Sequence, residues 1–586
     1  MATLATPTPR RQSSQSPSEI NSHVTASAAL EAVGARPRRV QRRPTKQASY
    51  ELCNHAKAYL EGGQYATGYD FLHHLLAAGT SISTPAQPCI GFLAPPSYLA
   101  FASSLVVYPK TTTKTLSKEA KEGSDAALRY LQCVYSTMDA PAYPAIRHAF
   151  RFPEESSRRR GRNHRSAAGS MSPRGGDDVE LLSGDAANAE SLWTLAEDFW
   201  QLVGWAFNCA ISHRKRWDRW KLWLAIMLDF LEADWESCAR MTKDESDGAA
   251  ILRESLVWHY IIADSSSVNR AVRRRIVKAI LASASVESLK DFPEVWGDET
   301  EGPKRKKEAQ RFGHVSFETG DMGGYDGDQV MQDAPDETDD GALEEHVRTA
   351  GEEGIDAVEE LGGMDAVILR QRFLALLVRV TQGLPKDFTT TSDFFDTILE
   401  DFVRLPVATL ETLLATSRLP GPLHVAFCAN LLLPLTSGNI PNLLVSELSQ
   451  RHLESSLLPL KGITQGFAAN AKVSLIIEQI MMHMMRQDAL TATDTLRTAM
   501  EAGIQLRQSV HGTGKGKRGN AEEELQGKIV LESCSERLLG ILEVLELKEG
   551  KDPQPYDLKA PRSSFWSFGT SSPLSDAPGS ETDEDE

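Results

Sequence analysis

Apolar residues in this chain recur at intervals of three and four along much of its length, which is the spacing of one face of an α-helix. Glycine and proline divide the periodic segments into lengths that fit single helices. The alternation typical of a half-buried strand is almost absent, and its one example is KTTTKTL at 110–116. The sequence therefore predicts an all-α protein of helical-hairpin bundles or irregular α-solenoid blocks, joined by long disordered linkers.

Composition divides the 586 residues into three periodic blocks and four polar segments. The polar segments have too few large apolar side chains to offset the entropy of ordering, so we expect them to be disordered. They are a basic Ser- and Pro-rich tail at 1–46, a linker at 151–185, an acidic spacer at 298–362 and an acidic tail at 549–586. The predicted helical domains are 47–150, 186–297 and 363–548.

The net charge is concentrated in the acidic spacer. The whole chain has 63 basic and 80 acidic residues, a formal net charge of −17. Residues 298–362 hold 20 acidic and 6 basic residues, which accounts for −14 of that charge. The rest of the chain is close to neutral, so composition excludes a uniformly acidic protein.

Cysteine usage and the length of the apolar runs limit the compartment. The seven cysteines are scattered without a Cys-x-x-Cys pair, which indicates buried thiols in a reducing environment. No run reaches the 18 or so apolar residues of a membrane span, and the first residues lack the apolar core of a signal peptide. We therefore expect a soluble intracellular protein without membrane contact.

The motif patterns that carry catalysis are absent. The sequence has no G-x-S-x-G elbow, no H-E-x-x-H helix and no G-x-G-x-x-G loop after a strand. The run HGTGKGKRGN has three residues between Gly512 and Gly516 where a phosphate loop needs four, and Arg518 stands in place of the required Ser or Thr. Cys53 and His55 would face different sides of a helix, which argues against zinc. We predict no enzymatic activity, cofactor, metal or small-molecule substrate.

Tryptophan marks the second block. Eight of the ten tryptophans lie between Trp193 and Trp258, and HRKRWDRWKLW at 213–223 interleaves three of them with basic residues. Such rings can stack on bases while basic groups neutralise phosphates. However, Trp217 and Trp220 also continue through Leu224 as a stripe of core spacing. We favour the core of a central bundle helix, with nucleic-acid binding as the alternative.

The segment NRAVRRRIVKAIL at 269–281 is a second basic helix and the sharper candidate for a binding face. Val272, Ile276 and Ile280 define its apolar side. The basic residues expected on the exposed side are Arg270, Arg273, Arg274 and Lys278. Such a face binds phosphates or an acidic partner, or is simply solvated. The acidic spacer follows about 20 residues later, so it could fold back on this face and screen it.

Short motifs in the predicted disordered segments are candidate signals. Lys304, Arg305, Lys306 and Lys307 form a basic cluster of the nuclear-import type. A second, spaced basic cluster consists of Arg36, Arg38, Arg39, Arg42, Arg43 and Lys46. The phosphorylation candidates are Thr8, Ser580 and Thr582, and the candidates for docking into a partner's pocket are Phe565, Trp566 and Phe568.

The segment from His55 to Gly79 resembles one tetratricopeptide-type helical hairpin. Ala56, Tyr59, Gly62, Tyr65, Gly68 and Leu72 stand near the small and aromatic positions of that pattern. The resemblance covers about 25 residues, and no second copy follows 34 residues later. It implies helical-repeat packing and a peptide-binding groove.

These features predict a non-enzymatic nuclear scaffold or adaptor that binds protein partners in a chromosome-associated or other nuclear assembly. One alternative is a nucleic-acid-binding regulatory factor that uses the basic helices near 213–221 and 270–278. It would bind polyanions with an affinity that falls steeply with salt. The other alternative is a cytoplasmic helical-repeat adaptor.

Overall fold

The computed structural model describes residues 42–152, 181–242, 247–262, 268–303, 353–512 and 521–556. Within these ranges the protein is mostly helical, as the apolar spacing predicts. The described strands are β1 (Thr45–Gln47) and β2 (Gly91–Leu93), which pair in parallel. The one strand pattern of the sequence, at 110–116, does not form a strand, and its first residues belong to the 3₁₀ turn η1 (Pro109–Thr111). The described elements form two compact units.

Unit 1 takes in the described residues of 1–340 together with 361–389. Its helices are α2 (Tyr50–Glu61), α3 (Tyr65–Ala77), α4 (Pro96–Val107), α5 (Lys118–Thr137), α6 (Tyr143–Ala149), α8 (Leu192–Leu195), α9 (Phe199–Ser212), α10 (Arg214–Met241), α11 (Gly248–Arg253), α12 (Leu256–Ile262), α13 (Arg270–Ile280), α14 (Val286–Asp291) and α16 (Met364–Gly383). The further 3₁₀ turns are η2 (Ala140–Ala142) and η3 (Asp185–Ala187). Local signals start several helices: Ser117 and Asp198 cap α5 and α9 with their side chains, and Pro96 opens α4.

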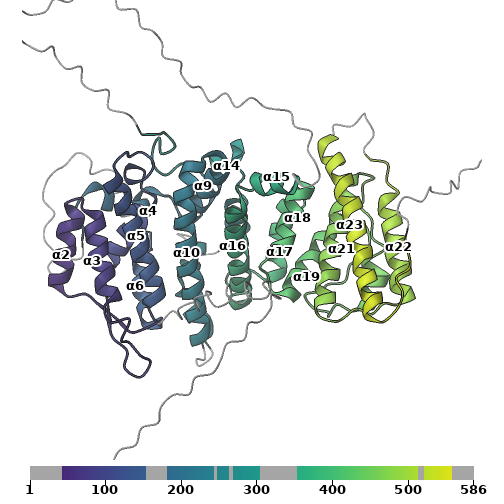
Figure 1. The fold of residues 1–586 in the computed structure, drawn as a ribbon, viewed down its shortest axis with the longest axis horizontal. Coiled ribbons are helices and arrows are strands. Elements are labelled where there is room, and N and C mark those ends of the chain that lie inside the picture. The colour runs from purple at the N-terminus through teal and green to yellow at the C-terminus, as the bar shows by residue number, and fades with distance from the viewer. Residues whose placement is uncertain are drawn as a thin grey trace, which may run out of the picture. The chain divides into compact units, whose positions relative to one another are not determined.

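The long helix α10 is the centre of unit 1. It contacts α4, α5, α9, α11, α12 and α16, and Figure 1 shows it standing between α5 and α16. A helix with neighbours on both sides buries two stripes instead of one, and α10 does so along its 28 residues. Trp217, Trp220 and Trp223 are at most 3% exposed. The prediction that these rings belong to a central core helix is confirmed.

Helix α16 completes the aromatic core of unit 1. The ring of Phe373 lies 6.1–6.3 Å from the rings of Phe199, Trp200 and Phe207 on α9. The turn before α16 requires glycine: Gly362 has a φ of +88°, and a Cβ there would lie 2.4 Å from the Cβ of Ala210. The chain therefore reaches α9 so closely at this point that any side chain would disturb the packing.

Unit 2 takes in the described residues of 341–360 and 390–586. Its helices are α15 (Glu353–Glu360), α17 (Thr391–Phe402), α18 (Val407–Ala415), α19 (Gly421–Leu432), α20 (Gln450–His452), α21 (Phe467–Arg486), α22 (Asp494–Gln508) and α23 (Ala521–Lys548), with one π-helical turn, η4 (Leu453–Leu457). The main contact joins α21 and α23, which lie side by side in Figure 1. The methionine-rich stripe of α21 packs into this core, because Ile480, Met481 and Met484 are at most 2% exposed.

Two features of the fold were not predicted from the sequence. Two short helices, α11 and α12, stand in place of one longer helix, and the Asp234 carboxylate accepts a hydrogen bond from the backbone N of Leu256, the first residue of α12, at 2.7 Å. Residues 353–360, inside the predicted disordered spacer, form α15. The segment that resembles a tetratricopeptide hairpin does form two consecutive helices, α2 and α3, that pack on each other. The repeat packing and the groove remain expectations.

Candidate functional site

The basic helix α13 is the first candidate site. Asn269 starts it, since its side-chain Oδ1 accepts a hydrogen bond from the backbone N of Val272 at 3.0 Å. The residues on the inner face, Ile276, Val277, Ala279 and Ile280, are all buried. Arg270, Arg274 and Lys278 are exposed and stand four residues apart, so they form one line on the outer face. We call these three residues the α13 row.

Arg273, the fourth basic residue predicted on this face, lies apart from the row. Its side chain is half-buried, and its Nη1 donates to the backbone O of Val268 at 3.4 Å. At the other end of the row, Lys278 lies 3.2 Å from the carboxylate of Asp291. The α13 row is therefore an exposed line of three basic side chains, and Asp291 lies beside Lys278.

Two basic residues of α10, Arg216 and Arg219, bond within unit 1 instead. Arg216 is 2% exposed, and its Nη2 contacts the fully buried Glu299 carboxylate at 3.0 Å and the backbone O of Val107 at 2.8 Å. Burial raises the pKa of the Glu299 carboxyl, and the guanidinium of Arg216 opposes this shift. Arg219 donates to Asp125 at 2.6 Å, and its Nε reaches the last turn of α4. These groups hold α10 against α4 and α5.

Lys221 and Arg214 of this stretch also make contacts within unit 1. Lys221 lies 3.2 Å from Asp218 and 3.3 Å from Asp365. Arg214 donates to the backbone O of Gly362 at 3.4 Å. Because the tryptophan rings between these residues are buried, they offer no exposed platform on which bases could stack.

Buried arginines recur at the ends of helices in both units. In unit 1, Arg370 donates to the backbone O of Ile280, Ala282 and Leu361 at 2.5–3.1 Å, and its guanidinium lies 4.2 Å from the centre of the Phe207 ring. In unit 2, the equivalent donor is Arg507, which bonds two carbonyls just after η4. Burial lowers the pKa of Arg370 to about 9 and that of Arg507 to about 10. These arginines satisfy carbonyls that end a helix without a partner.

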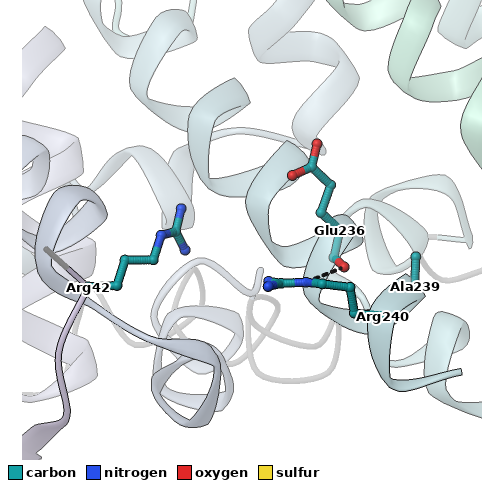
Figure 2. Close-up of a pocket in the computed structure, with 4 residues that line it drawn as sticks. All are labelled: Arg42, Glu236, Ala239 and Arg240. Carbon is teal, nitrogen blue, oxygen red and sulfur yellow. Dashed lines mark hydrogen bonds between the residues drawn. The ribbon is translucent and has the colours of Figure 1, made fainter. Parts of the chain in front are cut away.

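A pocket of about 510 Å³ opens beside the last turns of α10 and is the second candidate site. It is lined by Arg42, Glu236, Ala239 and Arg240. Figure 2 shows the guanidinium groups of Arg42 and Arg240 pointing into the same space from opposite sides. Both arginine side chains are exposed, and neither forms an ion pair with a carboxylate of the described residues. The one acidic side chain of the lining, Glu236, lies 3.1 Å from Arg379.

Contacts within the protein orient both arginines of the pocket. Nη1 of Arg42 donates to the hydroxyl of Tyr143 at 2.9 Å, and its guanidinium lies 5.9 Å from the centre of the Tyr135 ring. Nε of Arg240 donates to the backbone O of Glu236 at 3.3 Å, the contact drawn in Figure 2. Each guanidinium has five N–H donors and uses one of them in these bonds, so donors remain for a ligand.

Several predicted site residues lie outside the described residues. These are the import candidates Lys304, Arg305, Lys306 and Lys307, the docking candidates Phe565, Trp566 and Phe568, and the phosphorylation candidates Thr8, Ser580 and Thr582. Of the second basic cluster, Arg42, Arg43 and Lys46 are among the described residues. Arg43 is buried and donates to the backbone O of Leu76, Ala78 and Cys89, so it is a structural residue at the end of α3.

Sequence reasoning missed the pocket and the role of Glu299. Arg42 and Arg240 are 198 positions apart, and no local pattern joins them. Glu299 stands among acidic residues that indicate a solvated spacer, yet it is the buried partner of Arg216. The only available signal was the apolar pair Trp296 and Phe292 just before it, which extends the core pattern toward residue 299.

Three further observations concern the described residues. No group of three or more His, Cys, Asp or Glu side chains there is arranged to hold a metal ion. No disulfide joins the seven cysteines, all of which are described. None of the described helices combines the length and the apolarity needed to cross a membrane. In comparisons with known proteins, no family model, curated protein or solved structure matches the chain.

Proposed function

We propose that the protein is a non-enzymatic helical scaffold or adaptor that binds acidic protein partners in a nuclear assembly. The observation that carries the proposal is the α13 row, in which Arg270, Arg274 and Lys278 face solvent along one side of a well-packed helix. Positive charge arranged on a rigid element attracts and orients an acidic partner. The import-type cluster Lys304–Lys307 supports the nuclear setting.

The contacts of α10 favour a protein partner over nucleic acid. A nucleic-acid site gains its affinity from many basic groups that reach phosphates, commonly with aromatic rings exposed between them. Here Arg216 and Arg219 bond within unit 1, and the tryptophans near them are buried. The basic surface that remains is short, and Asp291 borders it. Nucleic-acid binding through the α13 row alone is the second candidate function.

The test is charge reversal of the α13 row in the full chain. The triple variant R270E/R274E/K278E is compared with R451E/K461E/K528E, which makes the same change in charge at exposed positions of unit 2. Partners are identified by proximity labelling and affinity purification. We expect the first variant to lose specific partners that the control variant keeps.

Salt titration separates the two candidate functions. For a protein partner we expect binding that weakens modestly between 50 and 200 mM salt, whereas a polyanion bound at several phosphates would lose affinity by orders of magnitude. If the triple variant keeps every partner of the wild type, the α13 row is only a solvated face and the proposal fails. Retained folding of the variant is checked by tryptophan fluorescence, because nine of the ten tryptophans lie in unit 1.

A further inference from the structure

We infer that the pocket between Arg42 and Arg240 binds an acidic segment of peptide, with each arginine taking a carboxylate or phosphate group of that segment. This inference goes beyond the proposed function, because the pocket uses none of the residues of the α13 row. It would stand as a separate site even if the row bound nothing.

The charges around the pocket favour an anion. Arg42 and Arg240 face it without a carboxylate partner among the described residues, and Glu236 is engaged by Arg379 at 3.1 Å. The carbonyl end of α10 would by itself repel an anion, but Arg240 places a positive guanidinium in this last turn. The pocket is therefore electropositive at the two points where a ligand would meet it.

The two arginines are held in place before any ligand arrives. Tyr143 and Tyr135 fix the Arg42 side chain by a hydrogen bond and a ring contact, and Arg240 is fixed to its own helix. Restricting these long side chains in advance lowers the entropy that binding must overcome. Guanidinium groups also offer paired N–H donors that match the oxygens of a carboxylate or phosphate.

The shape of the pocket favours a peptide over a small molecule. Sites for small ligands enclose most of the ligand surface and are lined mainly by apolar side chains. This pocket is broad and open to solvent, and three of its four lining residues are charged. Its volume of about 510 Å³ leaves room for several side chains of a chain that lies across the opening. The two arginines on opposite sides would then contact separate acidic residues of that chain.

The chain itself contains a probe with this chemistry. Residues 580–586, SETDEDE, are acidic and include the phosphorylation candidates Ser580 and Thr582. A fluorescent peptide of this sequence, its doubly phosphorylated form and a form with every acidic residue replaced by Ser or Asn are titrated with the purified full-length protein at about 0.15 M salt. Fluorescence anisotropy gives the Kd of each.

The variants are R42Q/R240Q, the single variant R240Q, and the control K118Q/K121Q, which removes two exposed lysines of unit 1. Losing a charge-assisted hydrogen bond weakens binding about tenfold or more. We expect at least this loss for R42Q/R240Q, an intermediate loss for R240Q, and a change below about twofold for the control. The neutral peptide should bind far more weakly to the wild type.

Two results would overturn the inference: equal binding of the acidic and neutral peptides, or R42Q/R240Q binding like the wild type. The single variant R240Q changes an exposed helix end, so it controls for a folding defect that the R42Q change next to β1 could cause.

A chain that ends at residue 576 distinguishes the source of the acidic segment. Tighter binding of the peptide to this shorter chain identifies its own tail as an occupant, whereas equal binding excludes the tail and leaves an acidic segment of another protein as the occupant. The variant R270E/R274E/K278E is titrated with the same peptide and should bind it like the wild type. This arm separates a failure of the pocket from a failure of the α13 row.

Discussion

Helices α10 and α13 have similar sequences and opposite roles. Each carries several basic residues within about ten positions and an apolar stripe at helical spacing. Near the start of α10, Arg216 and Arg219 bond within the protein, whereas three basic residues of α13 face solvent. The difference follows from packing: α10 has helices on both sides, while α13 is buried along one side only, where it contacts α9 and α16. The number of neighbouring helices therefore affects whether an arginine is buried within the fold or exposed to solvent.

The ion pairs of the two helices illustrate this contrast. The side chains of Arg216 and Glu299 are 2% and 0% exposed, whereas those of Lys278 and Asp291 are 56% and 43% exposed. A buried pair has lost its hydration, so removing one partner leaves an uncompensated charge in the interior. When one residue of a surface pair is removed, water hydrates the remaining charge at little cost in stability. The four predictions below test this contrast in order of decreasing effect.

The largest effect is expected from Arg216→Met. This change strands the Glu299 carboxylate in the core, and we expect unit 1 to lose about 3–5 kcal/mol of unfolding free energy. Urea unfolding followed by tryptophan fluorescence measures it. The double variant R216M/E299M, which removes both charges, should recover much of the loss. A single-variant loss below about 1 kcal/mol would contradict the importance of the pair.

The second prediction concerns Arg370→Lys, at the carbonyl end of α13. A lysine has no planar fork, so it cannot reach the carbonyls of Ile280, Ala282 and Leu361 together or stack on Phe207. We expect a loss of about 1–3 kcal/mol in the same assay. The control is Arg379→Lys, because Arg379 lies on α16 like Arg370 but at the surface. This change should alter stability by less than about 0.5 kcal/mol. Equal effects of the two changes would contradict a capping role for Arg370.

The third prediction concerns the other end of α13. Asn269→Ala removes the side-chain acceptor for the N–H of Val272, and we expect a loss of about 1 kcal/mol. Asn269→Ser keeps an acceptor and should be close to the wild type. Hydrogen exchange of the first turn of α13 is the more local measurement. If protection there were unchanged in the alanine variant, the cap would not be what orders this turn.

The smallest effect is expected from Lys278→Ala. Its pair with Asp291 is largely exposed, so we expect less than about 0.5 kcal/mol of lost stability. The same variant should still weaken binding to an acidic partner if the α13 row functions as proposed. A loss as large as that of Arg216→Met would remove the contrast between the two helices.

Most of the helical architecture was predictable from local patterns. The spacing of Trp217, Trp220 and Leu224 predicted the buried stripe of the central helix α10. Glycine and proline at the joints fixed many helix ends within a few residues. These features were predictable because the residues that determine them lie within a turn or two of the same helix or at its ends.

The missed features depend on contacts between distant positions. The break between α11 and α12 is stabilised by Asp234, 22 residues earlier, and Arg370 bonds carbonyls 88–90 residues before it. The buried state of Arg43 and Glu299 is likewise set by contacts that local composition does not contain. Of the candidate sites, the basic outer face of α13 was predictable from the sequence. The pocket at Arg42 and Arg240 was not, because its two sides come from the segment before β1 and from α10.

The dependence of α13 on α16 has a consequence for synthesis. Ribosomes add roughly 5–20 residues per second, so about 4–16 s separate the appearance of residue 303 from that of residue 383. During that time the carbonyls at the end of α13 lack Arg370, and the aromatic surface of α9 lacks Phe373. We expect the nascent chain to expose this surface to chaperones throughout the interval. We also expect that a fragment truncated at residue 303 will aggregate even though it contains most of unit 1.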